Sequence, residues 1–196
     1  KISKPNPGDT VIVTGAAGGV GSLAGQIFKI AGCNVYGIAG GKEKCEMLIN
    51  DFGFDGAIDY KSEDLNESLG KLCPNGADIV YDNVGGRILN DCLLHLALNA
   101  RIAICGIISR HKTDNMNFGP ENYSNLIFKR ATMQGFLMLD YVSETVSARN
   151  KMKKWIEDGK LICKEDLREG FENAPDTLKG LFDGKNKGKQ LLKIAD

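Results

Sequence analysis

The sequence has little of what several functional classes require. It contains only two histidines, and its six cysteines are scattered with no Cys-x-x-Cys pair, so a zinc site has few ligands to draw on. Neither sign of charge is in excess, because 25 lysines and arginines face 25 aspartates and glutamates. This balance excludes a global field that would favour nucleic acid or an anionic membrane.

Long apolar segments are also missing. No apolar run approaches the ~20 residues of a transmembrane helix, and no charged-then-apolar signal segment opens the chain. We therefore expect no metal, no nucleic-acid partner and no membrane partner. Scattered cysteines are typical of buried thiols in a reducing compartment, which predicts a cytoplasmic protein.

Strand and helix patterns alternate along the chain. Apolar runs predict strands at residues 11–13, 34–39, 56–60, 78–82, 101–105 and 132–137. Helical patterns lie between them, at residues 42–52, 63–72, 87–98 and 123–130, and a long helix follows at 142–158. This alternation predicts an α/β fold, a doubly wound six-stranded parallel sheet with helices on both faces. Residues 107–122 are polar and irregular, and the tail, 161–196, holds a short helix at 175–182 and a strand at 189–194.

The most informative stretch is a glycine-rich turn after the first strand. The run Val11-Ile12-Val13 stops at Gly15-Ala16-Ala17-Gly18-Gly19-Val20-Gly21, and a helical pattern begins at Leu23. A strand, a glycine turn and a helix in this order place a phosphate at the helix N-terminus, where a Cβ would hold the backbone N–H groups away from it. The alternative is a tight turn with no ligand. Together with the alternating units, the turn predicts a dinucleotide-binding Rossmann fold.

The end of the second strand indicates which dinucleotide binds. An NAD site needs Asp or Glu there, about 20 residues past the glycines, to bind the ribose 2′-OH. Ala39-Gly40-Gly41 stands there instead, followed by Lys42 and Lys44. This favours NADP(H), with Lys44 and Tyr60 placed to reach its 2′-phosphate. The alternative is a solvated helix start, although lysines near a helix N-terminus are unfavourable unless an anion binds there.

The glycine spacing also fits the short-chain dehydrogenases, which need a Tyr-x-x-x-Lys pair for proton transfer. None of the five tyrosines has a lysine four residues further on. This family is therefore excluded by its catalytic residues.

Several strings together resemble the medium-chain dehydrogenase/reductase superfamily, and within it the zinc-independent branch of prostaglandin reductase, leukotriene 12-hydroxydehydrogenase, plant alkenal reductases and curcumin reductase. The resemblance covers essentially the whole chain. The strings that carry it are Gly15 to Ser22, Gly53-Phe54-Asp55, Ile58-Asp59-Tyr60-Lys61, Tyr81-Asp82-Asn83-Val84-Gly85-Gly86, Ile102 to Ser109, Met133-Gln134-Gly135-Phe136 and Gly184-Lys185-Asn186-x-Gly188-Lys189.

The resemblance implies an NADPH-dependent enzyme that reduces the C=C bond of α,β-unsaturated ketones and aldehydes. Hydride passes to the β-carbon, and hydrogen bonds stabilise the enolate oxygen. A related NADPH:quinone reductase and a non-catalytic NADPH-binding module remain as alternatives. The implied cofactor contacts are Gly18, Gly19, Val20 and Gly21 at the pyrophosphate, Lys44 and Tyr60 at the 2′-phosphate, Asn83 at the nicotinamide ribose, Cys105, Gly106, Ile107, Ile108 and Ser109 along the nicotinamide half, Phe136, Leu137 and Met138 over the ring, and Asn186 from the tail.

The chain departs from this family in two ways. Family members carry an N-terminal GroES-like barrel that forms one wall of the substrate cleft, and the chain does not contain it. We therefore expect residues 1–196 to be the NADP(H)-binding domain of a longer protein. Residues 161–196 would pack toward the barrel, and the chain alone would turn over its substrate poorly. Mammalian and plant members place a tyrosine at the position of Phe128, whereas this chain carries Tyr123, as the bacterial curcumin-reductase type does. Tyr123 is therefore the candidate for the oxyanion contact. A homodimer would fit the family, whose late strands often pair across a dimer.

Overall fold

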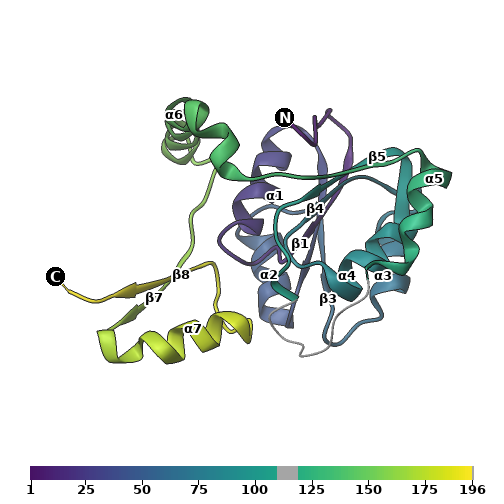
Figure 1. Ribbon diagram of the computed structural model, residues 1–196. Helices are drawn as coiled ribbons and strands as arrows, with labels where there is room; N and C mark the ends of the chain where they lie inside the picture. The colour runs from purple at the N-terminus through teal and green to yellow at the C-terminus, as the bar shows by residue number, and fades with distance from the viewer. Residues whose placement is uncertain (110–118, 196) are drawn as a thin grey trace.

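Six parallel strands form the main sheet of the computed structural model, which describes residues 1–109 and 119–195. Their order is β3-β2-β1-β4-β5-β6, so the direction of winding reverses between β1 and β4 (Figure 1). The strands are β1 (Thr10–Thr14), β2 (Asn34–Ala39), β3 (Gly56–Asp59), β4 (Ala77–Asp82), β5 (Leu96–Ile104) and β6 (Thr132–Gly135). The expected doubly wound sheet is confirmed, and ligands bind such sheets at the carboxyl ends of the strands beside this reversal.

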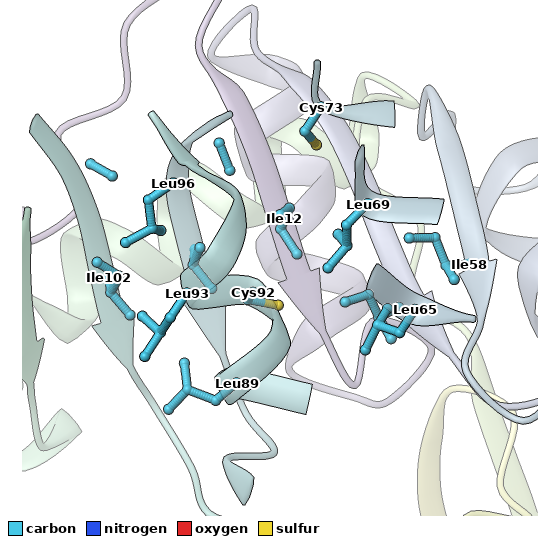
Figure 2. Packing of buried hydrophobic residues seen from close by; sticks show 14 residues of the cluster. Ile12, Ile58, Leu65, Leu69, Cys73, Leu89, Cys92, Leu93, Leu96 and Ile102 are labelled. Carbon is cyan, nitrogen blue, oxygen red and sulfur yellow. The ribbon is translucent and has the colours of Figure 1, made fainter. Parts of the chain in front are cut away.

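Alternate residues of the strands belong to two hydrophobic clusters, one on each face of the sheet. Val11 and Val13 of β1 pack with helices α1 (Gly21–Ile30) and α2 (Lys42–Asn50), whereas Ile12 between them packs on the opposite face. Figure 2 shows this second cluster, where helices α3 (Leu65–Leu72) and α4 (Gly86–Cys92) contribute leucines. Burial on both faces explains the continuous apolar strands, which are typical of parallel sheets.

The predicted helix over residues 87–98 is wrong beyond Cys92. A short 3-10 turn, Leu93–His95, follows α4, and β5 then begins at Leu96, which pairs with Ala77 of β4. The register shifts between Ala77 and Ile79, and Asn99 takes a positive φ of 61° in the same stretch of β5. Short leucine-rich runs fit helical and extended periodicities equally well, so the pattern alone did not separate the two.

The later part of the chain lies beside the sheet (Figure 1). A 3-10 turn, Glu121–Ser124, precedes α5 (Asn125–Lys129), and the expected long helix is α6 (Thr145–Glu157). The tail forms a separate parallel pair, β7 (Glu165–Glu169) with β8 (Lys189–Lys193), connected through α7 (Ala174–Phe182). Strand β7 was not predicted, because its sequence EDLRE has no apolar alternation.

Residues 110–118, in the middle of the stretch predicted to be irregular, lie outside the described residues, as does residue 196. Among the helices of the described ranges, none is both long enough and apolar enough to cross a membrane.

Candidate functional site

The carboxyl ends of β1, β2, β4 and β5 open into a cavity of about 1130 Å³, which tail residues also line. The sequence-predicted residues that line it are Gly18, Gly19, Val20, Gly21, Lys44, Tyr60, Asn83, Cys105, Gly106, Ile108, Ser109 and Asn186. A second cavity of about 440 Å³ shares Cys105 and Gly106 with the first and adds Ile107, Phe136 and Leu137. The fold thus gathers most of the predicted set at one edge of the sheet.

Two predicted residues line neither of these cavities. The side chain of Met138 is 64% exposed, and that of Tyr123 is 63% exposed in the 3-10 turn before α5. Tyr123 thus lies outside the lining of both of these cavities. Its role as the oxyanion contact stays a prediction.

Each glycine of the turn after β1 has its own structural reason. An ideal Cβ on Gly21 would lie 2.3 Å from the carbonyl oxygen of Gly15, so the turn itself requires glycine there. A Cβ on Gly19 would lie 2.7 Å from Cδ of Lys189, so this glycine admits the tail. A Cβ on Gly18 would meet only the Gly15 carbonyl oxygen, at 3.4 Å, which leaves Gly18 as the position whose open face is free for a ligand.

The N-terminus of α1 follows this turn and suits an anion. The residue before the helix, Val20, makes no side-chain capping hydrogen bond, and the first helical turn carries no acidic residue. The Ser22 amide donates to the Gly18 carbonyl at 3.0 Å. The other uncapped N–H groups of the first turn and the positive end of the helix dipole both favour negative charge. A phosphate on the open face of Gly18 would lie near these N–H groups and near the positive end of the helix dipole.

A buried carboxylate organises the loops at the carboxyl ends of β4 and β5. Asp82, with no exposed surface, accepts hydrogen bonds from the Thr14 hydroxyl at 2.6 Å and from the Gly85 amide at 2.9 Å. The Thr14 hydroxyl in turn accepts from the Asn83 amide at 2.9 Å, and Asn83 Nδ2 donates to the Thr14 carbonyl at 2.7 Å. Burial raises the pKa of Asp82, although these donors work in the opposite direction. Thr14 and Asp82 were not predicted as site residues.

The loop after β5 is attached to the same residues. The amides of Cys105 and Gly106 donate to the Asp82 carbonyl at 2.7 and 3.2 Å, and the Ser109 amide donates to the Val84 carbonyl at 3.1 Å. The Ser109 hydroxyl oxygen is buried and has no hydrogen-bond partner among the described residues. Since Ser109 lines the large cavity, this unpartnered hydroxyl is available to a bound ligand.

The part of the cavity at the end of β2 includes Lys44, and Glu63 and Asp64 also line the cavity. Lys44 is half-buried at the start of α2, and its ammonium donates to the Gly184 carbonyl of the tail at 2.7 Å. Burial lowers the pKa of Lys44, and the nearby charge of Lys61 lowers it further. The Tyr60 ring lies beside Gly40 on the same edge. Strand β2 carries no carboxylate of its own at its end, where Gly40 and Gly41 follow Ala39, but the Asp59 carboxylate from the end of β3 accepts a hydrogen bond from the Gly41 amide at 2.7 Å.

The tail lies against the glycine turn. The Gly188 amide donates to the Ala17 carbonyl at 3.0 Å, and Gly18 forms a parallel bridge with Gly188. Asn186 is buried and its amide donates to the Gly188 carbonyl at 2.8 Å, so this group shapes the tail as well as lining the cavity. Arg87 and Lys189 also line the cavity but were not predicted as site residues.

A parallel sheet that reverses its winding beside a glycine turn defines a Rossmann-type α/β protein. A family model described as zinc-binding dehydrogenase matches residues 19–155, and the chain belongs to this family. Within residues 1–109 and 119–195, no three His, Cys, Asp or Glu side chains lie together in a group that could hold a metal ion.

Curated relatives place the chain in the branch that the sequence strings resemble. It is 42% identical to 2-alkenal reductase (NADP(+)-dependent) of Nicotiana tabacum, over 100% of this chain and 57% of the relative. It is 38% identical to NADPH-dependent curcumin reductase of Escherichia coli, over 99% of this chain and 58% of the relative. The chain therefore spans little more than half the length of these relatives.

Solved structures agree with this placement. CurA of Vibrio vulnificus in complex with NADPH superposes with a TM-score of 0.94 at 42% identity, over 100% of this chain and 59% of that chain. An Escherichia coli quinone oxidoreductase matches at a TM-score of 0.82 and only 23% identity, a likeness that shows the fold alone.

Proposed function

We propose that this chain is the NADP(H)-binding part of an oxidoreductase that reduces the C=C bond of α,β-unsaturated ketones and aldehydes. The observation that carries the proposal is the cavity that joins the Gly18–Gly21 turn to Lys44 and Tyr60 at one end and to Asn83 and Cys105 at the other. Its volume of about 1130 Å³ leaves room for a dinucleotide, with the 2′-phosphate beside Lys44.

The residues present fit this cofactor. The open face of Gly18 and the uncapped N-terminus of α1 suit the pyrophosphate, and the unpartnered Ser109 hydroxyl suits a polar group of the nicotinamide half. Lys44 supplies the positive charge that a 2′-phosphate requires and a 2′-hydroxyl does not. When bound, NADPH would supply the hydride.

The protein's own contribution would be orientation and exclusion of water. The chain of hydrogen bonds from Asp82 through Thr14 to Asn83 would hold the nicotinamide end in one geometry. Ile107, Phe136 and Leu137 make the smaller cavity largely apolar, which suits the hydrocarbon part of an unsaturated carbonyl substrate.

The similarity to 2-alkenal reductase and curcumin reductase over the whole chain supports an enone or alkenal as substrate. Because the chain spans just over half of these relatives, we infer that efficient turnover needs a further domain, which the tail from residue 161 would help to contact. A cytoplasmic location fits the six free thiols. Strand β6 has a partner on one side only in the described sheet, which leaves an edge for a homodimer.

The test is NADPH oxidation followed by absorbance, with the full-length protein and a panel of enones, alkenals, quinones and saturated ketones. We expect NADPH consumption with enones and alkenals, and much less with NADH. Turnover of quinones alone would favour a quinone reductase instead. NADPH binding with no turnover of any carbonyl would favour a non-catalytic binding module.

A further inference from the structure

A second lysine reaches the end of β2, where cofactor specificity is set. An ideal Cβ on Gly40 would lie 2.8 Å from Cε of Lys61 and 3.1 Å from Cζ of Tyr60. The side chain of Lys61 therefore crosses the face of Gly40, in the region where an NAD site carries its carboxylate. Because glycine has no Cβ, Lys61 and Tyr60 can lie there together.

The backbone beneath Lys61 is held firmly. Asp59, which is only 8% exposed, accepts from the Gly41 amide at 2.7 Å and from the Lys61 amide at 3.0 Å with the same oxygen. Its other oxygen accepts from the Ser62 hydroxyl at 2.8 Å. Although burial acts against them, these donors hold the pKa of Asp59 below its ordinary value. The ends of β2 and β3 are thus fixed to each other, and the place where the Lys61 side chain begins is fixed with them.

The anionic groups around this end already have partners. The Glu63 carboxylate accepts from the Asp59 amide at 2.8 Å and from the Ser68 hydroxyl at 3.0 Å. Lys187 is paired with Glu43. The Lys61 ammonium, in contrast, has neither a hydrogen bond nor an ion pair within residues 1–109 and 119–195.

Lys44 lines this end of the cavity, and Lys61 reaches Gly40, which also lines it, so the two side chains lie close enough for the charge of Lys61 to act on Lys44. The only hydrogen-bond partner of the Lys44 ammonium in the described chain is the neutral Gly184 carbonyl. Like charges this close to each other are unfavourable. The Asp166 carboxylate acts on Lys44 and the Asp59 carboxylate on Lys61, so an anion that lies near both lysines would relieve their repulsion further. A phosphate monoester, with a charge of about −1.5 to −2 at pH 7, matches two lysines better than one.

We propose that Lys61 is a specificity-determining residue that binds the 2′-phosphate of NADP(H) together with Lys44 and Tyr60. This inference rests on the proposed function and deepens it. NADH carries a hydroxyl where NADPH carries the phosphate, so Lys61 contributes to NADPH binding and not to NADH binding.

The test measures dissociation constants for NADPH, NADH and 2′,5′-ADP with wild-type protein and three variants. Lys61→Met keeps the aliphatic stem over Gly40 and removes the charge, and Lys61→Arg restores a charge. Lys42→Met is the matched control, because Lys42 stands at the same helix start but its ammonium lies 3.7 Å from Glu46. Circular dichroism and thermal melts establish that each variant is folded.

We expect Lys61→Met to weaken NADPH and 2′,5′-ADP about tenfold, in the range of one charge-assisted hydrogen bond, and NADH less than twofold. Lys61→Arg should recover most of this loss, and Lys42→Met should change nothing. Unchanged NADPH binding by Lys61→Met, or an equal loss for NADPH and NADH, overturns the inference. A wild-type protein with no preference for NADPH over NADH would instead contradict the proposed cofactor itself.

Discussion

Replacing Thr14 with valine should disconnect the loops that line the cavity. The Thr14 hydroxyl donates to the buried Asp82 carboxylate at 2.6 Å and accepts from the Asn83 amide at 2.9 Å. Valine has nearly the same shape, so it keeps the packing of this fully buried position and removes both hydrogen bonds. Thr14→Ser is the matched control, since it keeps the hydroxyl and loses only a methyl group.

The magnitude follows from the two bonds. A hydrogen bond to a charged group contributes about 1.5–3 kcal/mol, and leaving a partly buried amide without its partner costs about 1 kcal/mol more. We therefore expect Thr14→Val to lower the free energy of unfolding by about 2–4 kcal/mol. Thr14→Ser should lose about 1 kcal/mol for the buried methyl group.

Urea denaturation of both variants measures these losses, and NADPH and NADH titrations should show weaker binding of both cofactors to Thr14→Val. The pH dependence supplies an independent check. Burial raises the pKa of Asp82, and the Thr14 hydroxyl stabilises only its charged form. The loss caused by valine is therefore full above the pKa of Asp82 and shrinks as the pH falls through it. The reasoning fails if Thr14→Ser is as destabilised as Thr14→Val at neutral pH.

Three further predictions test other parts of the structure. Gly25→Ala should destabilise the protein by about 1–3 kcal/mol in denaturation experiments, because its Cβ would lie 2.0 Å from Cζ of the buried Phe54, whereas Gly135→Ala, with open space around it, should change little. Gly21→Ala should weaken NADPH and NADH binding alike in titrations, because its Cβ would collide with the turn backbone. As the pH rises, NADPH affinity should begin to fall at a lower pH than the loss of charge of an ordinary lysine would give, because burial and the charge of Lys61 lower the pKa of Lys44. NADH affinity, measured in the same titrations, should stay level.

Much of the fold and half of the site followed from local sequence. The apolar runs of β1, β2 and β4 are nearly continuous because both faces of the sheet are buried there, and a single strand carries this signal in its own sequence. The glycine turn, Lys44 and Tyr60 come shortly after strand ends, and those ends can also be recognised in the sequence. What escaped prediction depends on pairs far apart in sequence. Thr14 and Asp82 are 68 positions apart and meet only because β1 lies beside β4.

The same argument explains why Lys61 gave no signal of its own. In isolation it is an exposed lysine after a strand, like many others. Strand β2 pairs with β3 so that Ala39 lies opposite Asp59, and the residues that follow each strand therefore meet at one edge. A shift of this register by one residue would carry Lys61 away from Gly40 and turn Tyr60 to the other face. On our proposal, cofactor specificity at this site would depend on the pairing between two strands, because the glycine at the end of β2 leaves room for the lysine that follows β3.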